Sequence, residues 1–125
     1  KQTAGKFTRS IYFLDAHGAA AWPILDELSL IRSGVVVVHD FDIGHSRFAF
    51  DSYDGVNLDG RLLAKVLAAG QIFYQSNPTA QTPFPCLQTG RRTGVAVVPY
   101  GVPASEACAA VAREPRHALV PRAIS

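Results

Sequence analysis

Hydrophobic residues occur along this chain in short runs that are separated by polar and turn-forming residues. Two runs, Ile11–Leu14 and Val35–Val38, contain only apolar residues, and the second has four valines in succession. Such runs are typical of β-strands that are covered on both faces, because a strand with one wet face would alternate between apolar and polar residues. Between the runs, apolar residues recur at three- and four-residue steps from Ile24 to Ile31, which predicts an amphipathic helix.

The residues that flank this helix agree with an order of strand, helix and strand. Pro23 suits the first turn of a helix, where a missing N–H breaks no hydrogen bond. Gly34 is expected to end the helix as its left-handed C′ residue. Two strands joined by a helical crossover run parallel, and the crossover is right-handed. The sequence therefore predicts a βαβ unit.

The second half of the chain predicts a long loop, a second helix and two further strands. The loop, residues 41–56, is rich in Asp, Gly, Ser and aromatic residues and is longer than ordinary connections. Asn57 or Asp59 can cap the helix that follows. Residues 71–75 are expected to form a strand. Gly94 to Tyr100 is expected to form its antiparallel neighbour and to stop at Pro99.

The whole chain of 125 residues is expected to form one α/β domain. Its sheet is expected to be partial and Rossmann-like, with two parallel strands, a crossover helix, an antiparallel strand pair and flanking helices. A short Ala-rich helix is expected at residues 105–113. Residues 1–9 and 114–125 are expected to be flexible ends.

Composition and charge exclude several classes of protein. The chain is 48% hydrophobic and 18% charged, which suits a folded core, and its formal charge is only +2. The chain contains no basic run with interleaved aromatic residues, so nucleic acid is not expected as a partner. No apolar stretch approaches the roughly 18 residues of a membrane span, so a membrane is not expected either. Cys86 and Cys108 lack metal-binding spacing and are expected to be free thiols in the cytoplasm, with a disulfide as the alternative.

The start of the chain predicts that something else completes the sheet. The chain contains no Met, and no apolar segment of a secretion signal follows its first residues, so we expect it to begin after a cleavage or within a longer gene product. The strand at Ile11–Leu14 has nothing before it to pair with its outer edge, and bare apolar edges invite association. We therefore expect a homo-oligomer or a companion chain.

An acid and a histidine follow each apolar run. Asp15 and His17 come after the first run, and His39 and Asp40 come after the second. Parallel strands end at the same edge of a sheet, where open α/β sheets bind ligands, so the four side chains are expected to gather there. Carboxylate and imidazole groups suit Mg²⁺, Mn²⁺ or Zn²⁺. The alternative is that these acids only cap loops and solvate the edge.

Several segments together resemble the carboxyl-terminal half of class I S-adenosylmethionine-dependent methyltransferases, in the branch that acts on sugars and small molecules. The segments are FLDAHG, WPILDEL, VVVVHDF and FAFDSYDG, followed by QIFYQSN and RRTGVAVVPY, which are similar to the antiparallel sixth and seventh strands of that family. The resemblance covers residues 10–101. The family holds its methyl donor with a glycine-rich loop, and no Gly-x-Gly-x-Gly occurs in this chain. The resemblance therefore implies one half of the fold, with S-adenosylmethionine bound only when a glycine-rich half is supplied.

The resemblance also implies roles for the residues at the sheet edge. Asp15 and Asp40 match the acids that hold a divalent ion, expected to be Mg²⁺, near the acceptor hydroxyl. The ion would lower the pKa of that hydroxyl and orient it. His39 or His17 would take up the proton, since imidazole titrates near neutral pH. The implied reaction is O-methyl transfer to a small molecule or sugar.

The long loop supplies candidate residues for binding the acceptor. If it acts as a lid, its polar members would contact the substrate: His45, Arg47, Asp51 and Tyr53. The alternative is a solvated loop that its aromatic residues hold in place. Two further functions remain open, a non-catalytic α/β module that assembles through its exposed strand, and a metal-dependent hydrolase that uses the acids and histidines of the sheet edge.

Overall fold

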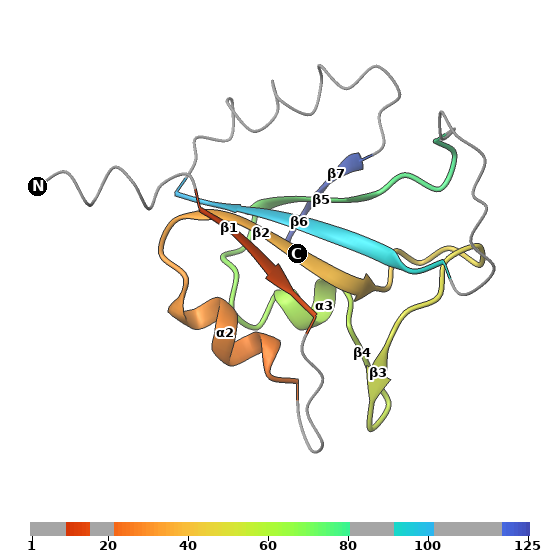
Figure 1. Cartoon of the computed structure of the whole chain (residues 1–125), viewed down its shortest axis with the longest axis horizontal. Coiled ribbons are helices and arrows are strands. Elements are labelled where there is room, and N and C mark those ends of the chain that lie inside the picture. The colour runs from red at the N-terminus through yellow and green to blue at the C-terminus, as the bar shows by residue number, and fades with distance from the viewer. Residues whose placement is uncertain (1–9, 16–21, 81–91, 102–118) are drawn as a thin grey trace, which may run out of the picture.

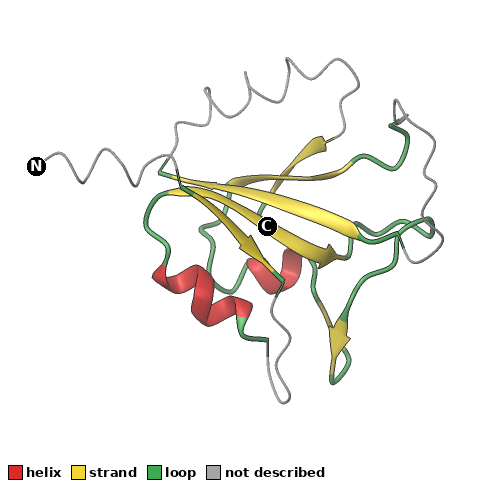
Figure 2. Ribbon diagram, in the orientation of Figure 1, coloured by secondary structure: helices red, strands yellow, loops and turns green. Residues whose placement is uncertain are grey.

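Five strands of the chain form one mixed sheet. The computed structural model describes residues 10–15, 22–80, 92–101 and 119–125. In chain order the elements are β1 (Ile11–Leu14), α2 (Ile24–Leu30), β2 (Gly34–Phe41), β3 (Ser52–Tyr53), β4 (Val56–Asn57), α3 (Gly60–Leu63), β5 (Ile72–Ser76), β6 (Gly94–Tyr100) and β7 (Leu119–Ala123). The sheet has the order β1-β2-β6-β5-β7, and β3 and β4 form a separate pair (Figure 1). The fold is mixed α/β and consists mostly of sheet (Figure 2).

The predicted βαβ unit and the predicted antiparallel pair are both present. β1 pairs parallel with β2, with Ile11 opposite Val35 and Leu14 opposite Val38. α2 lies between them in sequence and begins directly after Pro23, as expected. β5 and β6 are antiparallel, and β6 is also antiparallel to β2, beside which it lies.

The core lies between the sheet and the two described helices, which cover the same face (Figure 1). The core side chains that are less than 3% exposed come from β2, β5, β6 and both helices: Leu28, Val36, Val38, Phe41, Leu62, Leu63, Tyr74, Ala96 and Val98. Burial of each Val, Leu or Phe side chain contributes about 1.5–3 kcal/mol. α2 has 7 residues and α3 has 4, and no helix in the described ranges is long and apolar enough to cross a membrane.

The expectation that β1 is covered on both faces is wrong. Ile11 is 74% exposed and Phe13 is 62% exposed. β1 is an edge strand, and the described helices pack against the opposite face of the sheet, where Tyr12 and Leu14 contact the core. The apolar run in β1 therefore leaves two apolar side chains exposed on an edge strand of the sheet.

Two boundaries differ from the sequence-based expectation. Helix α2 already ends at Leu30, because Ile31 is extended. Gly34, with φ of 121°, opens β2 instead of capping the helix, and a Cβ there would collide with the Ser10 carbonyl oxygen. β6 continues through Pro99, which is compatible with pairing because β5 meets β6 only at Ala96 and Val97.

Part of the segment 114–125, which was expected to be a flexible end, forms a strand of the sheet. β7 pairs antiparallel with β5, with Phe73 opposite Arg122, and Ile124 is buried. Pro121 is tolerated because β7 is an edge strand. The helix expected at 105–113 and the end at 1–9 lie outside the described residues.

The segment 41–56 contains more regular structure than the sequence analysis expected. β3 and β4 form a hairpin whose turn residues, Asp54 and Gly55, have φ of 48° and 76°. Asp-Gly is the pair that two-residue hairpin turns of this kind prefer. Backbone hydrogen bonds tie the segment to the sheet, from Ala49 N to Arg92 O and from Asp51 N to Asp40 O.

We predict that Gly94→Ala destabilises the fold by about 1–3 kcal/mol, because a Cβ at Gly94 would overlap the Phe41 carbonyl oxygen across the β2–β6 pair. Gly60→Ala is the matched control. A Cβ at Gly60 would meet the Phe73 ring, with Cζ at 3.5 Å and Cε1 at 3.9 Å, which are ordinary contacts, so this variant should stay within about 0.5 kcal/mol of the parent. Urea unfolding measures both, and equal effects would contradict the close approach.

Candidate metal centre

Three predicted site residues meet where β1 and β2 end. The Nδ1 atom of His39 lies 3.3 Å from Asp15 Oδ1 and 3.3 Å from Asp40 Oδ1. One potential ligand atom from each residue lies within 4.8 Å of the other two. The Asp40 side chain is 14% exposed, whereas the side chains of His39 and Asp15 are 37% and 45% exposed. The cluster is therefore buried on one side and reachable from solvent on the other.

The parallel register brings Asp15 to His39. Leu14 pairs with Val38, so the next residues of the two strands, Asp15 and His39, lie level with each other at the rim of the sheet. Because the two strands are parallel, their carboxyl ends lie at the same edge of the sheet.

A β-bulge brings Asp40 to the same point. His39 pairs with Val95 and Phe41 pairs with Gly94, so Asp40 is an extra residue in β2. Consecutive strand residues normally point to opposite faces of a sheet, and the bulge interrupts this alternation. Asp40 has φ of 57°, in the left-handed region that Asp tolerates better than most residues.

The spacing of the three ligand atoms suits a divalent cation. Atoms that each lie about 2.0–2.2 Å from one ion are about 3.0–3.5 Å apart, which agrees with the two distances of 3.3 Å. His39 Nδ1 is buried and makes no hydrogen bond of good geometry, although two carboxylate oxygens lie nearby. Buried polar atoms without a hydrogen bond are uncommon and call for an explanation. The donor set of two carboxylates and one imidazole fits a metal ion.

Two further residues orient the His39 ring. His39 Nε2 lies 3.3 Å from Thr93 Oγ1, at hydrogen-bond distance. The ring of Phe13 packs against the His39 ring, with centroids 5.8 Å apart. A partner on the second ring nitrogen typically fixes the orientation of a metal-binding histidine. The sequence analysis did not identify Thr93, because its place beside His39 depends on the β2–β6 pairing.

The other residues proposed from sequence are not part of this cluster. His17 lies outside the described residues. The backbone N–H of Arg47 donates to His45 Nδ1 at 3.1 Å, and Arg47 Nη1 donates to the Pro78 carbonyl oxygen at 2.7 Å. These contacts hold the loop to itself and to the segment after β5.

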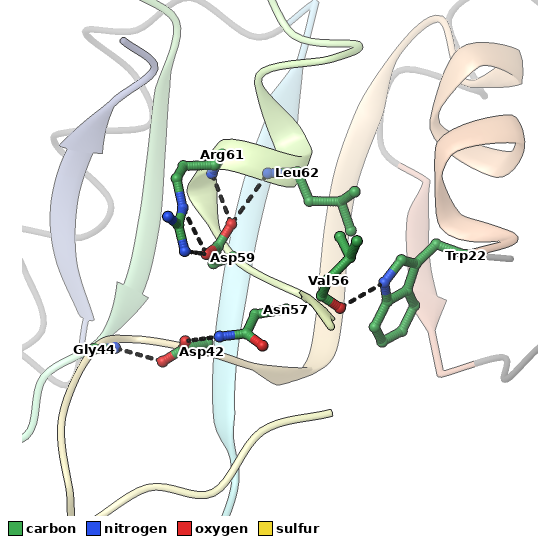
Figure 3. Close-up of polar contacts among 8 residues, drawn as sticks. All are labelled: Trp22, Asp42, Gly44, Val56, Asn57, Asp59, Arg61 and Leu62. Atoms are coloured by element: carbon green, nitrogen blue, oxygen red, sulfur yellow. Dashed lines mark hydrogen bonds and ion pairs between the residues drawn. The ribbon is translucent and has the colours of Figure 1, made fainter. Parts of the chain in front are cut away.

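Asp51 and Tyr53 contact residues that belong to the cluster or lie next to it. The backbone N–H of Asp51 donates to the Asp40 carbonyl oxygen at 3.0 Å. Tyr53 packs edge-on against Trp22, with ring centroids 4.5 Å apart, and Trp22 Nε1 donates to the Val56 carbonyl oxygen at 3.1 Å (Figure 3). Trp22 packs at the start of α2 and also supports the β3–β4 hairpin.

A larger pocket of about 550 Å³ borders α3 and β7 and shares no lining residue with the cluster. Its two aspartates already have partners. Asp42 accepts hydrogen bonds from Gly44 N and Asn57 Nδ2, and Asp59 accepts from the Arg61 side chain and from the backbone at the start of α3 (Figure 3). These carboxylates are satisfied within the fold, so their geometry indicates a structural role.

The pKa values of two side chains, Arg61 and Tyr100, are raised above their ordinary values. The hydrogen bond and the charge of Asp59 raise the pKa of Arg61, so this guanidinium remains a cation beside its acid. Burial raises the pKa of Tyr100, whose hydroxyl therefore stays neutral. Tyr100 pairs with Gly34, at the end of β2 opposite to His39, and has no part in the cluster.

Glu27, which was not proposed from sequence as a site residue, lines a small cavity beside Asp15 and His39. The available signal was position, because Glu27 follows Ile24 by three residues and falls within the apolar stripe of α2.

Comparison with known proteins adds no assignment. No family model, no curated protein and no solved structure matches the chain.

The left-handed backbone at Asp40 leads to a prediction. Asp40→Val should be less stable than Asp40→Asn by about 1–2 kcal/mol, because Asn tolerates positive φ and a β-branched residue does not. Both variants remove the negative charge of Asp40, so the loss of that charge does not contribute to their difference. Urea unfolding in the presence of a chelator measures it, and equal stabilities would contradict the bulge.

Proposed function

We propose that this chain is the metal- and acceptor-binding part of an S-adenosylmethionine-dependent methyltransferase-like domain, which transfers a methyl group to a hydroxyl of a small molecule or sugar. The observation that carries the proposal is the meeting of Asp15, His39 and Asp40 at the ends of two parallel strands. In open α/β sheets this edge is where ligands bind.

The order of the elements supports this proposal. A parallel pair with a crossover helix precedes an antiparallel pair, β5 and β6, as the resemblance to the carboxyl-terminal half of such enzymes implies. We therefore describe the sheet as part of a Rossmann-like fold. S-adenosylmethionine would be held by a glycine-rich half outside these residues, supplied by further sequence or by a companion chain.

The three residues have distinct parts in the proposed centre. Asp15, His39 and Asp40 would hold a divalent cation, which would lower the pKa of the acceptor hydroxyl and orient it. The exposed part of Asp15 leaves an approach for the acceptor, and Asp40 is on the buried side. If His39 binds the ion through Nδ1, the same atom does not act as the base. An imidazole ligand also favours Mn²⁺ or Zn²⁺ over the Mg²⁺ that the acids alone suggest.

The metal centre gives a direct prediction. Mn²⁺ at about 100 times its dissociation constant should stabilise the protein by about 2.7 kcal/mol, seen as a higher unfolding temperature and as heat in a calorimetric titration. Asp15→Asn and Asp40→Asn should each abolish both signals, because each removes one ligand charge. Asp26→Asn, which removes an exposed acid of α2, is the control and should keep them. If neither ligand variant changes the response to Mn²⁺, the centre is wrong.

Binding of the methyl donor, S-adenosylmethionine, is tested by a separate calorimetric titration. The chain by itself should give no heat with S-adenosylmethionine, with or without Mn²⁺. The same chain joined to the glycine-rich half should bind the donor and transfer its methyl group. An upstream reading frame that lacks a glycine-rich strand–turn–helix would count against the methyltransferase assignment and would leave the metal centre intact.

A specific observation also favours the second candidate function, a non-catalytic α/β module that assembles through β1. Ile11 and Phe13 are highly exposed on an edge strand. Exposed apolar edge strands are sites of association with another chain. In this alternative the acids only solvate the rim.

Assembly through β1 predicts that the wild-type chain sediments as a dimer or larger species. Ile11→Thr combined with Phe13→Ser should shift it to a monomer, since both changes remove exposed apolar surface from the edge. Leu30→Ser removes an exposed leucine from α2 and should leave the assembly unchanged. A wild-type chain that sediments as a monomer across micromolar concentrations would contradict this role of β1.

A further inference from the structure

A small cavity lies behind the candidate metal centre, on the side of α2. Its polar lining consists of Asp15, His39 and Glu27, and apolar groups such as those of Trp22 and Leu58 enclose it. Its volume is about 10 Å³, which is about the space that one water molecule needs.

Two atoms of residues that line this cavity are buried and make no hydrogen bond, Glu27 Oε2 and His39 Nδ1. A buried carboxylate oxygen without a partner costs about 1–3 kcal/mol or more, so polar groups in such places usually have a ligand or water as their partner. That both residues line one cavity points to a shared partner.

The charges around the cavity indicate that this partner belongs to a cation. Two carboxylates, Asp15 and Glu27, line the cavity, Asp40 lies beside His39, and no Lys or Arg is among the described residues that line it. Carboxylates that lie close together repel one another, and a bound cation reduces this repulsion. Glu27 is not among the residues whose ligand atoms lie within 4.8 Å of one another, so it would reach a bound ion through a water molecule in the cavity that it lines.

We propose that Glu27 is an outer ligand of the metal centre, which accepts a hydrogen bond from a metal-bound water molecule in the cavity. Its carboxylate holds that water on the interior side of the ion and adds a third negative charge to the site. The inference rests on the proposed metal centre and assigns it a residue beyond Asp15, His39 and Asp40. Carboxylates in this position commonly change metal affinity 10- to 100-fold.

The test compares Glu27→Gln with the wild-type chain by calorimetric titration with Mn²⁺ and by thermal unfolding of the metal-free protein. We expect the Mn²⁺ dissociation constant to rise at least tenfold. The unfolding temperature of the metal-free protein should not fall, because the substitution removes a negative charge whose Oε2 atom is buried without a hydrogen-bond partner. A residue that acts only in packing would not give this combination.

Asp26→Asn is the matched control, since it removes the neighbouring acid from the same turn of α2 but is exposed, and it should leave the Mn²⁺ affinity unchanged. If Glu27→Gln does not fold, Glu27→Asp serves in its place, with weakened Mn²⁺ binding expected because the shorter side chain draws back from the water. Unchanged affinity in the Glu27 variant, with Mn²⁺ bound by the wild type, overturns this inference alone. Failure of the wild type to bind Mn²⁺ overturns it together with the metal centre.

Discussion

The parallel pairing of β1 with β2 is the constraint on which the candidate centre depends. Its register places Leu14 opposite Val38, and this alignment brings Asp15 level with His39. A slip of one residue would turn every side chain of β1 to the other face of the sheet. The contacts of Tyr12 and Leu14 with the core oppose such a slip. Apolar packing in the core thereby determines the geometry of polar groups at the rim.

The third member of the cluster depends on a local departure from regular structure. Asp40 reaches His39 only because β2 contains one residue more than its partner strand requires. Backbone strain of this kind persists where the surroundings impose it, and here Phe41 is buried directly after the bulge and lies against Gly94. The fold thus concentrates two carboxylates around one imidazole, an arrangement that repulsion between the acids opposes and a cation would relieve.

The sequence predicted those parts of the structure that local patterns determine. Runs of apolar residues located β1 and β2, and the crossover rule placed Asp15 and Asp40 at one rim. The bulge at Asp40 and the position of Thr93 were not predictable, because both follow from pairing with β6, more than fifty residues away in the chain. An apolar run does not reveal whether a strand is central or at an edge, so the exposure of Phe13 was missed. Pro121 concealed β7, whose formation depends on the distant β5.

The outer edge of β1 has a consequence for the rim. A strand that hydrogen-bonded to this edge in parallel would lie about 4.8 Å away and would end level with Asp15. The first residue after such a strand would lie next to Asp15 at the rim. A neighbouring polypeptide would therefore border the proposed metal centre, which would then lie at a seam between two sequences.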